Sequence, residues 1–109
     1  VTSLPFGTAK LVEMARALVA GPKLLLLDEP AAGLNPLETR ELARLIRRIR
    51  EELGTAVLLV EHDMALVMDV CERIAVLDFG KKIFEGSSRD VQRNPVVIDA
   101  YLGKRGSIA

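Results

Sequence analysis

Two short apolar segments, each running straight into polar side chains, constrain the fold of this 109-residue chain more than any other feature. Leu24–Leu27 leads into Asp28-Glu29-Pro30, and Ala56–Val60 leads into Glu61-His62-Asp63. Short apolar runs bounded by turn formers are typical of strands buried on both faces of a parallel sheet. Ligands bind such sheets at the carboxyl ends of the strands. The polar residues after the two runs are therefore the candidate functional residues.

Helical patterns alternate with these runs. The first covers Ala9–Leu18, where apolar residues recur at helical spacing. Asn35 as N-cap and Pro36 in the first turn begin a second helix, and Gly54 is expected just after its end. Asp63 is expected to cap a third helix, from about Met64 to Val70. Strand and helix alternate, which predicts an α/β fold with a parallel sheet flanked by helices.

The C-terminal part carries a different pattern. Ile74–Leu77 is expected to be a third strand of the parallel sheet, and a turn at Phe79-Gly80-Lys81 leads into its hairpin partner Lys82–Glu85. Ser87 and Asp90 resemble a capping box, and Val96–Leu102 is a last short helix. We expect one small α/β domain over residues 1–109, ending in this hairpin and short helices.

Composition excludes several classes of function. Lys+Arg and Asp+Glu both number 15, so no nucleic-acid partner is expected. No apolar run approaches the ~20 residues that a membrane span needs, and the start of the chain does not resemble a signal peptide. The single cysteine, Cys71, forms no internal disulfide and is interpreted as a mid-helix core residue. A run of charged residues is interpreted as a solvated helix face, and it comprises the three arginines Arg47, Arg48 and Arg50 with Glu51 and Glu52.

The polar residues after the strands suit phosphate chemistry. Asp28, just past an apolar strand, is placed to hold Mg²⁺. Glu29 beside it can orient and deprotonate a water that attacks a phosphate. His62, the only histidine, can donate a hydrogen bond to a terminal phosphate. Gly7 lies at a helix start, where backbone N–H groups can approach a phosphate.

Together these segments resemble the ATP-binding-cassette family. Leu4-Pro5-Phe6-Gly7-Thr8 stands where the family has its signature, Leu-Ser-Gly-Gly-Gln, and Leu24–Asp28 is similar to its Walker B strand. Glu29 matches the catalytic glutamate, and His62 matches the switch histidine. Ala31-Ala32-Gly33-Leu34-Asn35-Pro36 matches the loop that crosses to a partner subunit, with Asn35 in place of the usual Asp. The resemblance covers the whole chain and implies part of the P-loop NTPase fold.

A narrower resemblance concerns three segments. These are similar to one of the two ATPase subunits of branched-chain amino acid importers, and they comprise Ala31–Pro36, Val60–Met64 and Asn94–Gly103. The lipopolysaccharide-export ATPase is a near relative with a similar tail and remains an alternative. A soluble cassette protein acting on DNA or the ribosome is a second alternative, although the chain lacks the coiled-coil or basic insertions usual there. A third is a non-catalytic module that donates a signature helix to a partner.

The resemblance implies a mechanism. Two subunits would close head to tail on two ATP molecules and drive membrane permease subunits, which receive substrate from a periplasmic or extracellular binding protein. The subunit would lie in the cytoplasm, on the inner face of the membrane. Asp28 would help to hold Mg²⁺, Glu29 would polarise the attacking water, and His62 would contact the γ-phosphate. The contacts to nucleotide and partner would come from Leu4, Pro5, Phe6, Gly7, Thr8 and Asn35.

The chain departs from the family in two respects. It contains no Gly-x-x-x-x-Gly-Lys-Ser/Thr loop, so we expect it neither to bind ATP through such a loop nor to be active alone. Its signature is also altered, since Pro5, Phe6 and Thr8 replace Ser, Gly and Gln. Losing a hydrogen bond to a charged group costs roughly 1.5–3 kcal/mol, whereas the remaining helix end is worth about 0.3–1 kcal/mol. A weakened trans contact is therefore expected.

The missing loop also has a structural consequence. In the family, the phosphate-loop strand lies between the strands that correspond to Ala56–Val60 and Ile74–Leu77. Without it, we expect either that these two strands pair directly, or that the chain is marginally stable and self-associates through its open edges. The start of the chain, which lacks an initiator methionine, is consistent with entry partway through a domain.

Overall fold

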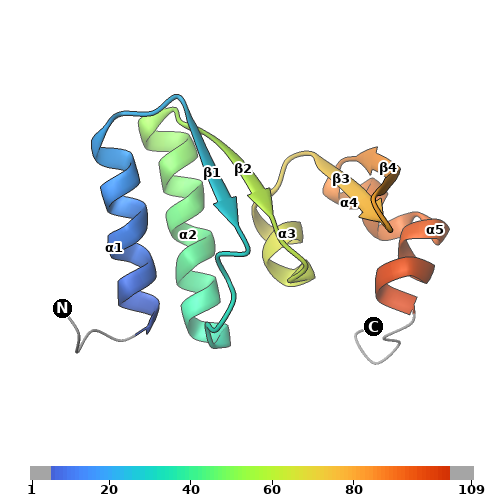
Figure 1. The fold of residues 1–109 in the computed structure, drawn as a ribbon. Coiled ribbons are helices and arrows are strands. Elements are labelled where there is room, and N and C mark those ends of the chain that lie inside the picture. The colour runs from blue at the N-terminus through green and yellow to red at the C-terminus, as the bar shows by residue number, and fades with distance from the viewer. Residues whose placement is uncertain (1–5, 104–109) are drawn as a thin grey trace. The chain divides into compact units, whose positions relative to one another are not determined.

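The structure is a computed structural model that describes residues 6–103, and these fall into two compact units that meet in sequence at Val70 and Cys71. The first unit holds three helices and two strands, and the second holds the hairpin and the short helices (Figure 1). The first contains α1 (Phe6–Val19), β1 (Leu24–Asp28), α2 (Pro36–Leu53), β2 (Ala56–Val60) and α3 (Met64–Val70). The second contains β3 (Ile74–Asp78), β4 (Lys81–Gly86), α4 (Ser88–Arg93), α5 (Pro95–Val97) and the π-helix η1 (Ile98–Gly103).

Strands β1 and β2 form the predicted parallel pair. Leu24 is opposite Ala56, and Asp28 is opposite Val60, so both strands end at the same edge. The expected burial on both faces is wrong, however. Leu25 and Leu27 are buried, but the side chains that alternate with them are exposed, Leu26 by 65%. The described residues leave this second face of the sheet uncovered.

Helix α2 begins and ends where the sequence predicts. The Asn35 side chain accepts from the Glu38 N–H at 2.8 Å, while the Glu38 carboxylate accepts from the Asn35 N–H at 3.0 Å. This is a complete capping box. Gly54 ends the helix in the left-handed conformation (φ 67°). The buried stripe of α2 consists of Leu42, Ala43, Ile46 and Ile49.

Two arginines of α2 contact α3. Arg47 forms an ion pair with Asp69 at 2.8 Å, and Arg50 donates to the Val70 carbonyl at 2.8 Å. Only Arg48 of the three behaves as the predicted solvated charge, since it pairs with Glu52 one turn later on the exposed face. The interpretation of the whole charge run as a solvated face is therefore wrong for Arg47 and Arg50. Their contacts, together with the buried Leu66 and Val67 of α3, hold α3 against α2.

Cys71 does not lie in a helix. Helix α3 ends at Val70, and Cys71 is a half-buried residue of the connection that leads to β3. The expectation of a mid-helix core residue is wrong because the apolar pattern of α3 stops one residue earlier, at the buried Val70.

The second unit is built on an antiparallel hairpin. Strands β3 and β4 pair through a turn at Phe79 (φ 51°) and Gly80 (φ 78°). Two consecutive positive φ angles are the mark of the type I′ hairpin turn. Ile74 and Val76 of β3 are buried, as are Val91 and Val97 of the helices that follow. Ser87 caps α4 by accepting from the Asp90 N–H at 3.2 Å, which confirms the predicted helix start.

Two expectations for the third strand are wrong in the described part of the chain. Strand β3 is not hydrogen-bonded to the parallel pair, since β1 and β2 form one two-stranded sheet and β3 and β4 form another. For the same reason β2 and β3 do not pair directly. The hairpin supplies β3 with a partner that is adjacent in sequence. None of the helices in residues 6–103 is long and apolar enough to cross a membrane.

Candidate functional site at the ends of the parallel strands

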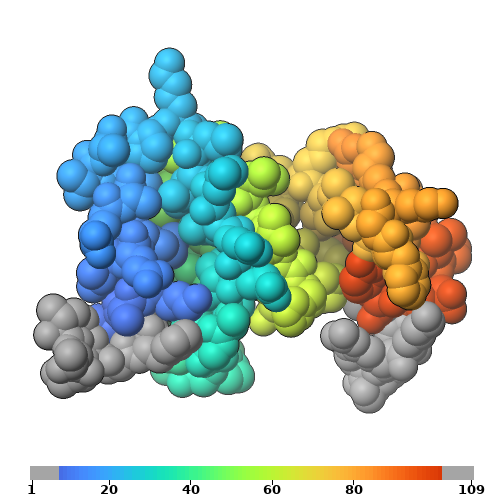
Figure 2. All heavy atoms as spheres, in the orientation of Figure 1, coloured from blue at the N-terminus to red at the C-terminus, as the bar shows by residue number. Residues whose placement is uncertain are grey.

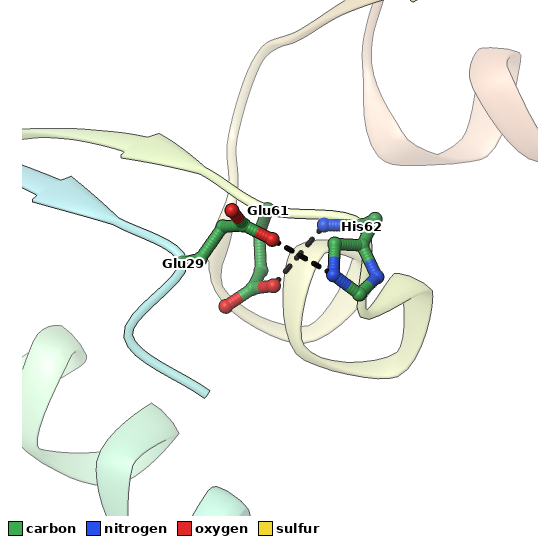
Figure 3. Close-up of side chains that lie close together, drawn as sticks. All are labelled: Glu29, Glu61 and His62. Carbon is green, nitrogen blue, oxygen red and sulfur yellow. Dashed lines mark hydrogen bonds and ion pairs between the residues drawn. The ribbon is translucent and has the colours of Figure 1, made fainter. Parts of the chain in front are cut away.

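The candidate site forms where β1 and β2 end. Glu29 follows β1 and His62 follows β2 by two residues, and their side chains point toward one another (Figure 3). His62 Nε2 lies 2.9 Å from Glu29 Oε1, and both side chains are at least half exposed. A carboxylate accepts and does not donate, so Nε2 carries the proton in this contact. The parallel register therefore brings together two of the residues that the sequence singled out for chemistry.

Backbone geometry holds Glu29 in place. Its φ of 48° is unusual for a residue with a side chain. The Glu29 N–H donates to the Val60 carbonyl at 2.7 Å, and its carbonyl accepts from the Ala32 N–H at 3.1 Å. The first bond continues the ladder between the strands, and the second closes a turn after β1. Together they turn the chain so that the Glu29 side chain faces the loop after β2.

Glu61 is a further member of the site that the sequence did not single out. Its Oε2 accepts from the Ala31 N–H at 2.9 Å, and its Oε1 accepts from the His62 N–H at 3.1 Å. Ligand atoms of Glu29, Glu61 and His62 all lie within 4.8 Å of one another. The only signal in the sequence was its place directly after a strand. The partner at Ala31 lies 30 residues away and is visible only in the structure.

Asp28 lies apart from this cluster. It is the last residue of β1, its side chain is exposed, and no described residue bonds its carboxylate. Mg²⁺ in phosphate-transferring sites is held by one or two carboxylates together with substrate oxygens and water. An accessible carboxylate at a strand end fits that requirement. A shallow hollow beside it is lined by β1 and by α1, including Met14 and Ala17 of the helix.

Three of the five predicted signature residues lie at the start of α1. Leu4 and Pro5 are outside the described residues. Phe6 and Gly7 form the first turn of the helix, and Thr8 is exposed. Figure 2 shows α1, in blue, beside the atoms of β1 and the loop after it, in cyan. Helix α1 thus begins three residues before the predicted Ala9, and Gly7 lies inside its first turn instead of ahead of it.

Asn35 lies in the loop between β1 and α2. Its side chain caps α2, and its carbonyl accepts from the Thr39 hydroxyl at 3.0 Å. The loop before it is shaped by Gly33 (φ 80°) and by the Leu34 N–H, which donates to the Ala31 carbonyl at 3.0 Å. Asn35 thus has a structural role as a cap, while its contact with a partner subunit remains a prediction.

The chain is similar to curated transport ATPases along almost all of its length. It is 47% identical over 103 residues to the high-affinity branched-chain amino acid transport ATP-binding protein LivG of Escherichia coli and of Salmonella typhimurium. The alignment covers 94% of this chain and 40% of those relatives. The chain belongs to the ATP-binding-cassette ATPase family. This cassette chain spans about two fifths of the length of the curated relatives it matches.

Other comparisons agree. The family model described as branched-chain amino acid ATP-binding cassette transporter matches residues 81–106 of the cassette chain. The ADP conformation of MJ1267, an ATP-binding cassette of an ABC transporter, superposes with a TM-score of 0.82 at 30% identity, over 93% of this chain and 41% of that one. CbiO1 of Clostridium perfringens, part of the transporter complex cbiONQ, gives a TM-score of 0.80 at 33% identity, over 98% of this chain and 44% of that one. The predicted partial cassette fold is confirmed.

Proposed function

We propose that these residues form the part of an importer ATPase subunit that carries out ATP hydrolysis, and that the complete subunit energises uptake of branched-chain amino acids. "Complete subunit" here means these residues joined to the nucleotide-binding segment that carries the phosphate loop. The observation that carries the proposal is the pairing of Glu29 with His62 at 2.9 Å, at the ends of adjacent parallel strands. The pair lies at the edge of the sheet where α/β proteins bind their ligands, namely the carboxyl ends of the strands.

The residues of the chain divide the chemistry between them. When bound, Mg-ATP would supply the phosphoryl group, and its metal would neutralise charge on the phosphate oxygens. Asp28 would hold the ion with its accessible carboxylate. Glu29 would orient the attacking water and take up its proton. His62 already carries its proton on Nε2, so it can turn from the Glu29 carboxylate to a phosphate oxygen as a hydrogen-bond donor.

The partners follow from the same proposal. The ATP-binding cassette MJ0796 is dimeric in a post-hydrolysis state with ADP and Pi, and its structure matches this chain with a TM-score of 0.68 at 31% identity. We propose a head-to-tail pair of subunits in which Gly7 and the start of α1 face the nucleotide of the partner. The pair would act on membrane permease subunits at the inner face of the membrane, and through them on an external substrate-binding protein.

The choice of substrate rests on the degree of similarity. LivG of Escherichia coli is 47% identical to the chain, whereas the lipopolysaccharide export ATP-binding protein LptB of Acidithiobacillus ferridurans is 40% identical over 97% of it. The match of residues 81–106 to the branched-chain amino acid family model favours the same substrate. These observations support import of branched-chain amino acids over the export alternative.

Transport by the reconstituted complex tests the proposal. The complete subunit and its permease are placed in proteoliposomes with internal ATP and with the substrate-binding protein outside. Uptake of leucine is then compared with uptake of methionine. Methionine is the matched control because the methionine import protein MetN of Burkholderia thailandensis is 45% identical over 82% of the chain. ATP-dependent uptake of leucine is the expected result. ATP hydrolysis accompanied by uptake of methionine but not of leucine would overturn the assignment of branched-chain amino acids as substrate. Absence of ATP hydrolysis would overturn the assignment of ATPase activity.

A further inference from the structure

The Glu61 carboxylate lies between the two loops that carry the proposed chemistry. One oxygen accepts the Ala31 N–H from the loop after β1, at 2.9 Å. The other accepts the His62 N–H from the loop after β2, at 3.1 Å, and receives a weaker contact from the Asp63 N–H at 3.4 Å. Both oxygens are therefore engaged, and the side chain is half-buried. Figure 3 shows this carboxylate beneath the pair formed by Glu29 and His62.

The two anchor points are close to the reacting residues. Ala31 follows Glu29 by two residues, and the His62 N–H belongs to the residue that contacts Glu29. Ala31 is 8% exposed, so water does not readily replace Glu61 as the acceptor for its N–H. A charged acceptor also forms stronger hydrogen bonds than a neutral one. A change at Glu61 would therefore release both loops at once.

We infer that Glu61 is a positioning residue, which sets the separation between the Glu29 carboxylate and the His62 imidazole by clamping the loops behind them. The inference rests on the proposed function, because it concerns hydrolysis by the complete subunit. Glu61 is not expected to contact the nucleotide or the attacking water molecule.

Two variants separate positioning from folding. Glu61→Ala removes both acceptors, and Glu61→Gln keeps one oxygen but places an amide N–H₂ against one of the donors. The matched control is Asp63→Ala, which removes the carboxylate that accepts the Leu66 N–H at 3.1 Å in the first turn of α3. The control perturbs the same segment and leaves the contact with Ala31 intact.

The kinetic readout is the split between kcat and KM. In the complete subunit, Glu61→Ala is expected to lower kcat for ATP hydrolysis about 10- to 100-fold, the scale of a misplaced catalytic group, and to leave KM within about twofold. The kcat of Glu61→Gln should lie between that of Glu61→Ala and that of the wild type. On a Glu29→Gln background, Glu61→Ala should have little further effect, because it acts through Glu29. Equal losses of kcat in Glu61→Ala and Asp63→Ala, or additivity with Glu29→Gln, would overturn the inference.

A second readout does not depend on hydrolysis. In the 109-residue chain, exchange of the Ala31 amide proton should accelerate at least tenfold in Glu61→Ala and should be unaffected in Asp63→Ala. An unchanged Ala31 amide in Glu61→Ala would show that the clamp does not exist. A complete subunit that hydrolyses no ATP with native Glu61 would overturn the proposed function, and the exchange experiment would still decide whether the clamp is present.

Discussion

Glu29 combines an unfavourable backbone conformation with an exposed side chain. Left-handed φ angles in residues other than glycine cost of order 1–3 kcal/mol and persist only where the surroundings impose them. Here the bonds of Glu29 to the Val60 carbonyl and the Ala32 N–H impose the conformation. Such outliers gather at functional sites. The strain is consistent with a side chain that is held ready for a reaction.

The first prediction concerns the role of Glu29 as a general base. In the complete subunit, Glu29→Gln should slow ATP hydrolysis about 10²–10⁴-fold, because an amide cannot take up the proton of the attacking water. Affinity for nucleotide should be preserved, since the shape of the side chain is unchanged. Single-turnover hydrolysis and nucleotide titration measure the two quantities. Glu41→Gln, at an exposed position of α2, is the control, and full turnover by Glu29→Gln would contradict the assigned role.

The second prediction concerns the partner of Glu29. His62→Ala removes the Nε2 donor, so hydrolysis should also slow, through the loss of a charge-assisted contact to phosphate. His62→Gln retains a donor on a side chain of comparable reach and should recover part of the rate. Hydrolysis by the three proteins under the same single-turnover conditions provides the comparison. A His62→Ala variant as fast as wild type would leave the histidine without a catalytic role.

Glu29 and His62 could be predicted from the sequence, because both lie just beyond apolar strands and parallel strands end at one edge. Glu61 could not be assigned a role in this way. Its function depends on a backbone N–H that lies 30 residues away, and any acidic residue at a loop start has the same local appearance. The position of Asp28 at the end of the strand could also be predicted. That Asp28 does not belong to the cluster of Glu29, Glu61 and His62 depends on the alternation of side chains along β1.

The start of α2 shows how far local sequence determines an element. Asn35 and Gly54 can be predicted as cap residues from the sequence, because each cap depends on contacts that span only a few residues. Contacts over longer separations were missed. Arg47 and Arg50 reach α3 across 22 and 20 residues, and Tyr101 of the π-helix η1 donates its hydroxyl to the Leu77 carbonyl across 24 residues. No local pattern contains these partners.

The third prediction tests the cap of α2. Asn35→Ala should lower the free energy of unfolding of the first unit by about 0.5–2 kcal/mol, because the Glu38 N–H loses its acceptor. Asn35→Asp keeps an acceptor and places a negative charge at the positive helix end, which contributes about 0.3–1 kcal/mol. Urea unfolding followed by circular dichroism gives the free energies of unfolding of both variants. Equal stability of the alanine and aspartate variants would show that the cap contributes nothing.

The fourth prediction concerns the hairpin of the second unit. Hydrogen bonds from Lys82 and Arg73, at 2.8 Å each, lower the pKa of the Glu85 carboxyl below its usual value. A lowered folded pKa means that the contribution of Glu85 to stability is present above the unfolded value, near 4.3. It is lost as the pH falls through the lower folded value. Arg73→Ala should move the pKa of Glu85 upward, as measured by carboxyl carbon NMR.

The control for this titration is Arg89→Ala. Arg89 is exposed on α4 and forms no ion pair among the described residues. Its removal should leave the Glu85 titration as in wild type. If the pKa of Glu85 is unchanged in Arg73→Ala, the lowering of that pKa is due to Lys82 alone. If it is unchanged in Lys82→Ala as well, neither ion pair causes the lowering.

At the scale of the whole molecule, the parallel pairing was predictable and the place of β3 was not. Alternating strand and helix patterns favour parallel pairing of β1 and β2, and the register confirms it. Which sheet β3 joins depends on which strands are present beside it. Among residues 6–103, β3 pairs with the neighbouring β4 alone, so two separate two-stranded sheets form. A periodicity that predicts the strand carries no information on that choice.

The exposed face of the first sheet raises a question of stability. Four apolar side chains on β1 and β2 are more than half exposed, namely Leu24, Leu26, Leu58 and Val60. A two-stranded sheet is at best marginally stable in water unless a further element covers it. Its edges also present unpaired N–H and C=O groups that another chain can bind. A domain is stable by only about 5–15 kcal/mol in total, so uncovered apolar surface and open edges are significant on that scale.

The last prediction follows from this surface. Since β2 and β3 do not pair, the second expectation remains, namely that the 109-residue chain self-associates through the open sheet. Sedimentation velocity should show species larger than a monomer whose fraction rises with protein concentration. Leu26→Lys or Leu58→Lys should lower that fraction, because a charge on the exposed face opposes stacking of sheets. Leu37→Lys is the matched control, since Leu37 is 58% exposed and belongs to α2 and not to a strand. In the complete subunit the phosphate-loop strand would pair with the open edge of β2, so association through that edge should be absent there. A monomeric chain with well-protected amides in β1 and β2 would contradict the prediction, because it would show that the two-stranded sheet is stable with one face uncovered.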